Sequence, residues 1–106
     1  MDTNTILKNA RQAIVDRGWT IGTVVDASGR VCLVGALRVG VGCDPLAFPI
    51  GEACSWSLVR VMSVLESELI FRRNDRNIAA FNDSCNNVQQ VLDFLDLFIE
   101  KDPSND

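Results

Sequence analysis

The chain has 106 residues, of which 47% are hydrophobic and 23% are charged, and its formal net charge is −4. This size fits one domain with a single core, and the composition is that of an ordinary globular protein. The negative charge disfavours unspecific binding to nucleic-acid backbones or anionic membranes. Histidine is absent from the sequence, which removes Ser-His and Cys-His nucleophilic pairs and the usual acid and base at neutral pH. We therefore expect a protein that is not an enzyme.

The sequence predicts neither a membrane segment nor a secretion signal. No stretch approaches the roughly 20 apolar residues of a spanning helix, and the first residues do not follow the order of a signal peptide. We expect a cytoplasmic protein with one domain at 1–102, a frayed tail at 103–106 and no cofactor or metal. The cysteines form no C-x-x-C pair, so free thiols are expected rather than disulfides or a zinc site: Cys32, Cys43, Cys54 and Cys85.

The first predicted helix runs from a threonine cap, Thr3 or Thr5, to Arg17, and Gly18 closes it because glycine adopts a positive φ at little cost. Its apolar face recurs at helical spacing: Ile6, Leu7, Ala10, Ala13 and Ile14. Aromatic and β-branched residues follow, then a turn signal at 26–29 and a second apolar run. This pattern predicts a β-hairpin, which helices must cover because an isolated hairpin is only marginally stable.

A short helix is predicted at 34–40, where Gly35 and Ala36 leave room for a close neighbour. A loop with two prolines follows at 43–51. The next helix, predicted to be the longest, runs from Glu52 to about residue 71. Its expected apolar stripe has seven members, and Trp56 is placed on the core face or at its rim: Leu58, Val59, Val61, Met62, Leu65, Leu69 and Ile70.

Two shorter helical segments complete the chain. Asn77 caps a short turn that residues 82–84 break. Asn86 or Asn87 then opens the last helix, and Asn86 with Gln89 resembles a capping box. Six apolar residues lie on one face of that helix: Val88, Val91, Leu92, Leu95, Phe98 and Ile99. The expected fold class is therefore α+β, mostly α, with four or five helices packed around one short β-hairpin.

Several motifs in this order resemble a family of small uncharacterised bacterial and phage proteins. They are Arg17-Gly18-Trp19 with Gly22, the run 26–38 with its Cys-x-x-Gly-Ala step, Ile78-Ala-Ala-Phe81-Asn82-Asp83 and a closing Val91-Leu92 helix. Phe81 departs from the pattern, because the family usually has tryptophan before Asn-Asp. The resemblance implies a domain of unknown function, so it supports the fold boundaries and adds no chemistry.

The Asn82-Asp83 step has two interpretations. The favoured one is that both side chains cap and turn the chain between two helices by bonding to nearby backbone amides. The alternative is that they line a pocket with Trp19 and bind a small polar ligand through paired donors and acceptors. Alanine substitution distinguishes the two, because a structural pair is needed for stability whereas a pocket pair can be replaced with the fold intact.

Arg72, Arg73 and Arg76 form the basic cluster of the sequence. The favoured interpretation is a helix C-terminus neutralised by cations. Otherwise these arginines contact an acidic partner protein or, less readily, a nucleic acid, for which the sequence offers no interleaved aromatic platform. They are therefore the candidate interaction residues.

The sequence as a whole predicts a non-enzymatic cytoplasmic interaction or regulatory protein, for example a phage-type modulator of a host factor. The expected partner is a protein, not a membrane or a nucleic acid. The alternative function is a small-molecule-binding domain with a pocket near Trp19, Asn82 and Asp83. The high apolar content also allows self-association into a homodimer; it includes Phe48, Ile50, Trp56 and Phe71.

Overall fold

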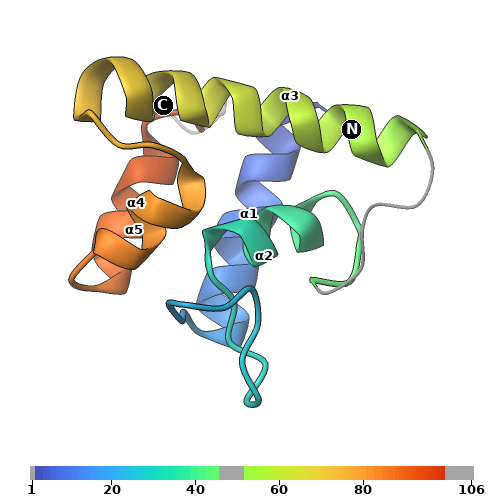
Figure 1. Cartoon of the computed structure of the whole chain (residues 1–106). Helices are drawn as coiled ribbons and strands as arrows, with labels where there is room; N and C mark the ends of the chain where they lie inside the picture. Colours follow the sequence, from blue (N-terminus) through green and yellow to red (C-terminus); the bar gives the residue numbers. More distant parts are fainter. Residues whose placement is uncertain (1, 46–51, 100–106) are drawn as a thin grey trace, which may run out of the picture.

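The structure is a computed structural model that describes residues 2–45 and 52–99, without the side chains of 52–55. α3 lies across one side of the molecule, α1 and α2 lie beneath it, and α4 and α5 stand at its C-terminal end (Figure 1). The predicted loop positions 46–51, with Phe48 and Ile50, and the tail at 103–106 lie outside the described residues. The elements are α1 (Thr3–Arg17), α2 (Leu33–Gly40), α3 (Glu52–Glu68), the π-helical turn η1 (Leu69–Arg73), α4 (Ile78–Ser84) and α5 (Val88–Asp96).

α1 packs against three of the other helices, α2, α3 and α5. Its predicted apolar face is confirmed, because the buried residues are the same five: Ile6, Leu7, Ala10, Ala13 and Ile14. Gly18 ends the helix with φ 91°, as expected. The predicted threonine cap is wrong: Asp2 caps the helix, and its Oδ1 accepts a hydrogen bond from the Thr5 amide at 2.7 Å. The hydrogen bonds from Thr5 lower the pKa of the Asp2 carboxyl.

α2 packs tightly against its neighbours because two of its residues are glycines. A Cβ added at Gly35 would overlap the carbonyl oxygen of Val24, and one added at Gly40 would lie 2.7 Å from the carbonyl oxygen of Ile6 in α1. The expectation that Gly35 permits a close neighbour is therefore confirmed. The close neighbour of Gly40 is α1, so the α1–α2 contact depends on the absence of a side chain there.

The predicted β-hairpin is wrong. Between α1 and α2 the chain forms a loop, residues 18–32, which we call the Trp19 loop, and the described residues contain isolated bridges but no strand. Val31 forms an isolated parallel bridge with Trp19 and an isolated antiparallel bridge with Val25. Neither bridge continues into a ladder of paired residues. The fold is consequently helical with a folded loop where an α+β fold was expected, although the mostly helical character is as predicted.

Asp26 supplies a physical reason why no ladder develops in the Trp19 loop. Its Oδ1 accepts hydrogen bonds from the amides of Ser28 and Arg30, each at 3.0 Å, and its Oδ2 pairs with the Arg30 guanidinium at 2.6 Å. Such local side-chain bonds compete with a β-ladder for the backbone donors. Desolvation acts to raise the pKa of the Asp26 carboxyl, but the hydrogen bonds from Arg30 and Ser28 outweigh it and the pKa is lowered.

α3 has the predicted start and length, but not all of its predicted buried face. Leu58, Val61, Leu65 and Leu69 are buried, as expected, whereas Val59 and Ile70 are exposed. Trp56 is not on the core face either. The last turn widens into η1 and ends at Asn74, whose φ of 56° is left-handed. Two apolar stripes therefore run along α3, and only one of them faces the core.

α4 begins as predicted at the Asn77 cap, whose Oδ1 accepts from the Ala80 amide at 2.8 Å. It does not break at Asn82 but continues to Ser84. Of the two predicted starts of α5, Asn87 is the one observed: its side chain caps the helix by accepting from the Gln90 amide. The Asn86–Gln89 capping box does not form, because the Asn86 amide donates to Gln90 instead. The buried set of α5 includes Phe94, which the predicted stripe omitted: Val91, Leu92, Phe94 and Leu95.

Candidate functional site

Asn82 connects three separate parts of the molecule. It is fully buried in α4, and its Oδ1 accepts hydrogen bonds from the indole Nε1 of Trp19 at 2.7 Å and from the amide of Leu33 at 3.0 Å. Its Nδ2 donates to the carbonyl oxygen of Thr20 at 3.1 Å and to Oδ1 of Asp83 at 3.2 Å. The amide thus uses both donor hydrogens and accepts twice, which is its full capacity.

Asp83 extends this network toward a small cavity. Besides the bond from Asn82, its Oδ1 accepts from the amide of Gly22 at 3.0 Å. The cavity has a volume of about 200 Å³ and is lined by the Trp19 loop, α2 and α4: Gly22, Thr23, Val24, Cys32, Val34, Ala79 and Asp83. This volume is below the roughly 300 to 1,000 Å³ of typical ligand pockets.

The structure therefore brings the three predicted pocket residues together, but with different roles. Trp19 and Asn82 bond to each other, and neither lines the cavity, which Asp83 does. The bonds of Asn82 reach residues far away in the sequence, so the network closes the Trp19 loop and the first turn of α2 onto α4 instead of turning the chain locally. A ligand-binding role for the three residues stays a prediction.

The three predicted interaction arginines have three different environments. Arg72 pairs with Glu68 one turn earlier in the same helical segment, at 3.4 Å. Arg73 points its guanidinium over the rings of Phe81 and Phe94, with its central carbon 5.6 and 5.1 Å from the ring centroids. Arg76 is exposed in the connection between η1 and α4. The cluster in the sequence is thus divided between a helix surface, an aromatic contact and a loop.

A second cavity, of about 550 Å³, lies between the end of η1, α4 and α5. Seven residues line it: Arg73, Asp75, Phe81, Ser84, Cys85, Gln90 and Asp93. Desolvation and the nearby charge of Asp75 raise the pKa of the Cys85 thiol, against a lowering effect of Arg73. A thiol with a raised pKa is a poor nucleophile at neutral pH. This cavity was not predictable from sequence periodicity, because its residues come from three separate segments of the chain.

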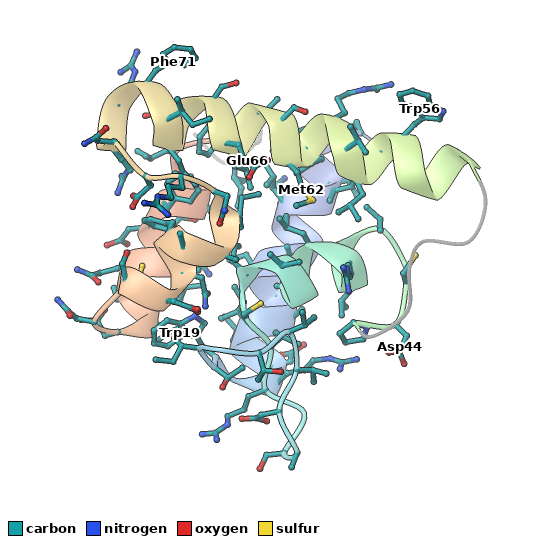
Figure 2. The ribbon with its side chains drawn as sticks, viewed as in Figure 1. Trp19, Asp44, Trp56, Met62, Glu66 and Phe71 are labelled. Atoms are coloured by element: carbon teal, nitrogen blue, oxygen red, sulfur yellow. The ribbon has the colours of Figure 1, made fainter. Side chains whose placement is uncertain are left out.

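The most prominent surface feature is the outer face of α3 and η1. Five large apolar side chains are exposed there, and we call them the α3 face: Trp56, Val59, Val64, Ile70 and Phe71. Trp56 is 66% exposed and Phe71 is 85% exposed. Figure 2 shows both rings directed away from the body of the molecule, whereas Met62 and Glu66 point toward it. Burying such side chains is favourable, so a face of this kind is suited to contact another apolar surface.

Sequence reasoning assigned Val59 and Ile70 of this face to the core, and it placed Trp56 on the core face or at its rim. The buried residues at 58, 61, 65 and 69 recur at helical spacing, and those at 56, 59, 64, 70 and 71 fall on the other side of the helix. The prediction combined members of both sets in one broad stripe, and the sequence pattern did not show where the buried side ends. The number of apolar residues in α3 was the available signal that some of them are exposed, because the helix carries more of them than a single buried stripe needs.

Among the residues described, no group of three or more His, Cys, Asp or Glu side chains is placed to hold a metal ion. Cys32 and Cys85 are free thiols. Cys32 caps α2, and its Sγ accepts from the Gly35 amide at 3.5 Å. None of the helices in the described ranges has the length and apolar content to cross a membrane.

Comparison with known proteins identifies a family and no activity. Residues 1–101 match the model of a family of unknown function (DUF6197). This match covers nearly the whole chain, including all the helices described above. No curated protein and no solved structure matches the chain. The function must therefore be argued from the geometry.

Proposed function

The chain belongs to DUF6197, a family of unknown function, and we propose that it is a protein-interaction protein that docks through the α3 face. The observation that carries this proposal is the exposure of Trp56 and Phe71 at the two ends of a helix face that also exposes Val59, Val64 and Ile70. Aromatic side chains are enriched at the centres of protein interfaces, where they supply large contact area with few rotatable bonds.

The size of the α3 face supports this proposal. The two aromatic side chains alone expose about 300 Å², because a side chain of this kind has roughly 150–250 Å². With the three aliphatic residues the face presents on the order of 600 Å², which is at the upper end of what monomeric proteins expose. Scattered single apolar residues need no explanation, but a row of this size on one helix does.

Photo-crosslinking tests the proposal in the cells that produce the protein. A benzophenone amino acid replaces Phe71 or, as the control, Ile21, which is 51% exposed and lies in the Trp19 loop. We expect crosslinked adducts of discrete mass from position 71 and none from position 21. The adducts should disappear when Trp56→Ser is added, because this change removes the second aromatic contact of the α3 face. The variant should remain folded, since a substitution at an exposed position alters stability by only about 0.5 kcal/mol. Adducts at both positions, or at neither, would contradict the proposal.

A second candidate function is small-molecule binding, and the cavity of about 550 Å³ beside Arg73 favours it. Its size is within the range of ligand pockets, and Arg73 provides a cation next to two aromatic rings. The test is a thermal-shift screen of small carboxylates and amines, repeated with Arg73→Gln. A shift that is lost in this variant supports the second function, and the absence of any shift argues against it.

A further inference from the structure

We infer that the α3 face binds a second copy of this chain, with the two α3 helices antiparallel about a two-fold axis near Val64. This inference rests on the proposed function and names the partner of that surface. It is argued from the arrangement of residues on the α3 face, from their charges and from the area that they offer.

The residues on and beside the α3 face are symmetric about Val64 in sequence to within one position. Arg60 and Glu68 lie four residues before and after it, Val59 and Ile70 lie five before and six after, and Trp56 and Phe71 lie eight before and seven after. An antiparallel pair centred on Val64 therefore brings an arginine opposite a glutamate, an aliphatic residue opposite an aliphatic one and an aromatic ring opposite an aromatic ring.

The same residues also match across the width of the face. Successive residues of a helix are about 100° apart, so each four-residue step advances by about 40° around the axis. Arg60, Val64 and Glu68 consequently follow one edge of the face, and Val59 and Ile70 follow the other. The two-fold axis lies in the contact plane and is perpendicular to α3. It reverses the direction of the helix, but each edge of the face in one copy still meets the same edge in the other copy. The same pairs of residues therefore meet both along the helix axis and across the face, as an isologous contact requires.

The charges on this surface favour such a pair. Arg60 is exposed and has no ion-pair partner among the described residues, and Glu68 is half-buried beside Arg72. In the antiparallel pair each Arg60 guanidinium meets the Glu68 carboxylate of the other copy, so two equivalent ion pairs form. The net charge of −4 makes two copies repel at long range, but this repulsion is screened beyond about 8 Å at physiological salt. The same charge disfavours an anionic bilayer as the occupant.

The area of the face places the contact in a size class. A face of about 600 Å² on each copy buries on the order of 1,200 Å² in total, which is the lower limit of the range for specific, stable interfaces. We therefore expect a reversible dimer whose population rises with protein concentration. Ser63 and Ser67 lie near the middle of the contact, and their small side chains let the two helices approach closely.

Sedimentation equilibrium of the purified chain over a wide concentration range tests the dimer. The decisive variant is Val64→Lys, which places two ammonium groups together at the two-fold axis. Its matched control is Val15→Lys on α1, because Val15 is 54% exposed and Val64 is 42% exposed. We expect the wild type and the Val15→Lys variant to dimerise and Val64→Lys to stay monomeric. A wild type that remains monomeric throughout overturns the inference, as does equal behaviour of the two variants.

A charge exchange tests the antiparallel register itself. Arg60→Glu places carboxylates opposite each other at two equivalent positions, and we expect about a tenfold weaker dimer. The double variant Arg60→Glu with Glu68→Arg restores opposite charges across the axis and should recover most of this loss. Circular dichroism confirms that each variant remains folded. A dimer that forms but is insensitive to both changes rules out this arrangement.

The failure of this inference can be told apart from the failure of the proposed function. If the purified chain is monomeric but crosslinked adducts at position 71 differ in mass from whole multiples of the chain, the docking surface stands and the second copy is wrong. If the adducts correspond to two chains, both hold. If no adduct forms and the chain is monomeric, both are wrong.

Discussion

At the scale of single residues, Asn82 links the most distant parts of the sequence. Its carboxamide receives bonds from Trp19 and Leu33 and gives bonds to Thr20 and Asp83, and it is fully buried. A buried carboxamide that makes all its hydrogen bonds is favourable. If it is removed, its former partners are left buried without a hydrogen bond, because water does not reach them. The residue that was predicted as a turn former or ligand contact thus holds the Trp19 loop and α2 against α4.

Replacing Asn82 should therefore be far more costly than replacing its neighbour. Asn82→Ala leaves the Trp19 indole and the Leu33 amide without acceptors, and we expect a loss of about 3 kcal/mol in the free energy of unfolding. Asp83→Ala removes an exposed side chain and should cost about 1 kcal/mol or less. Urea unfolding of both variants measures the difference. Equal, small losses for both would contradict the structural role of Asn82.

The carboxylate of Asp26 should make stability depend on pH in the acidic range. Its pKa in the folded chain is lowered from the ordinary value of 3.8, so its contribution to stability is present above that value and is lost as the pH falls through the lowered pKa. Asp26→Asn should thus be less stable than the wild type at about pH 7, and the difference should shrink toward about pH 2. Urea midpoints at several pH values check this; a constant difference would show that the charge has no role.

At the scale of elements, α3 and α2 show how packing selects among sequence patterns. α3 has two apolar stripes, and the stripe that contacts α1 and α4 is buried while the other forms the α3 face. In α2 the decisive residue is Gly40, whose lack of a side chain lets Ile6 and Ala10 of α1 come close. Helix propensity predicts neither the buried side of α3 nor the close approach of α1 to Gly40, because it describes an isolated helix.

Gly40→Ala gives a test in which propensity and packing predict opposite signs. In an isolated helix, alanine in place of glycine stabilises by about 1 kcal/mol. Here the new Cβ would lie 2.7 Å from the carbonyl oxygen of Ile6, so the two helices must separate. We expect a net loss of about 1–3 kcal/mol, measured by thermal or urea unfolding. A gain in stability would mean that α1 and α2 adjust without strain.

At the scale of the whole molecule, the two ends of the described chain meet between α1 and α5. Arg11 of α1 pairs with Asp96 of α5 at 2.8 Å on the surface. Within the core, the ring of Phe94 lies 4.5 Å from that of Phe81 and 5.3 Å from that of Phe98, centroid to centroid. The ion pair joins α1 to α5 and is open to solvent and salt. The pair of buried rings, Phe81 and Phe94, instead holds α5 against α4. We therefore expect the rings to contribute more than the ion pair to holding α5 in place.

Phe94→Ala should accordingly be among the most damaging changes in the protein. Removing a fully buried ring costs about 3–5 kcal/mol, which is a large part of the total stability of a domain of this size. Arg11→Gln breaks the ion pair and should cost about 1 kcal/mol or less. Urea unfolding of the two variants tests the ranking, and a larger loss for Arg11→Gln would reverse it.

Features with local causes were predictable from the sequence. The buried face of α1, its end at Gly18 and the Asn77 cap of α4 each depend on residues within a few positions of one another. The resemblance to an uncharacterised family agrees with the match to DUF6197 over 1–101. Of the candidate site residues, the sequence placed Trp19, Asn82 and Asp83 together but did not show which bonds they make.

What only the tertiary structure decided depends on partners far away in the chain. The residues after Gly18 form a loop and not a hairpin, and bonds to Asn82 from positions 63 and 49 residues earlier help to hold it. Which apolar residues of α3 are buried, and whether Phe94 is buried, depends in the same way on which helices lie opposite them. Local sequence determines which helices can form, whereas the burial of each surface is set by contacts that exist only once the chain has folded.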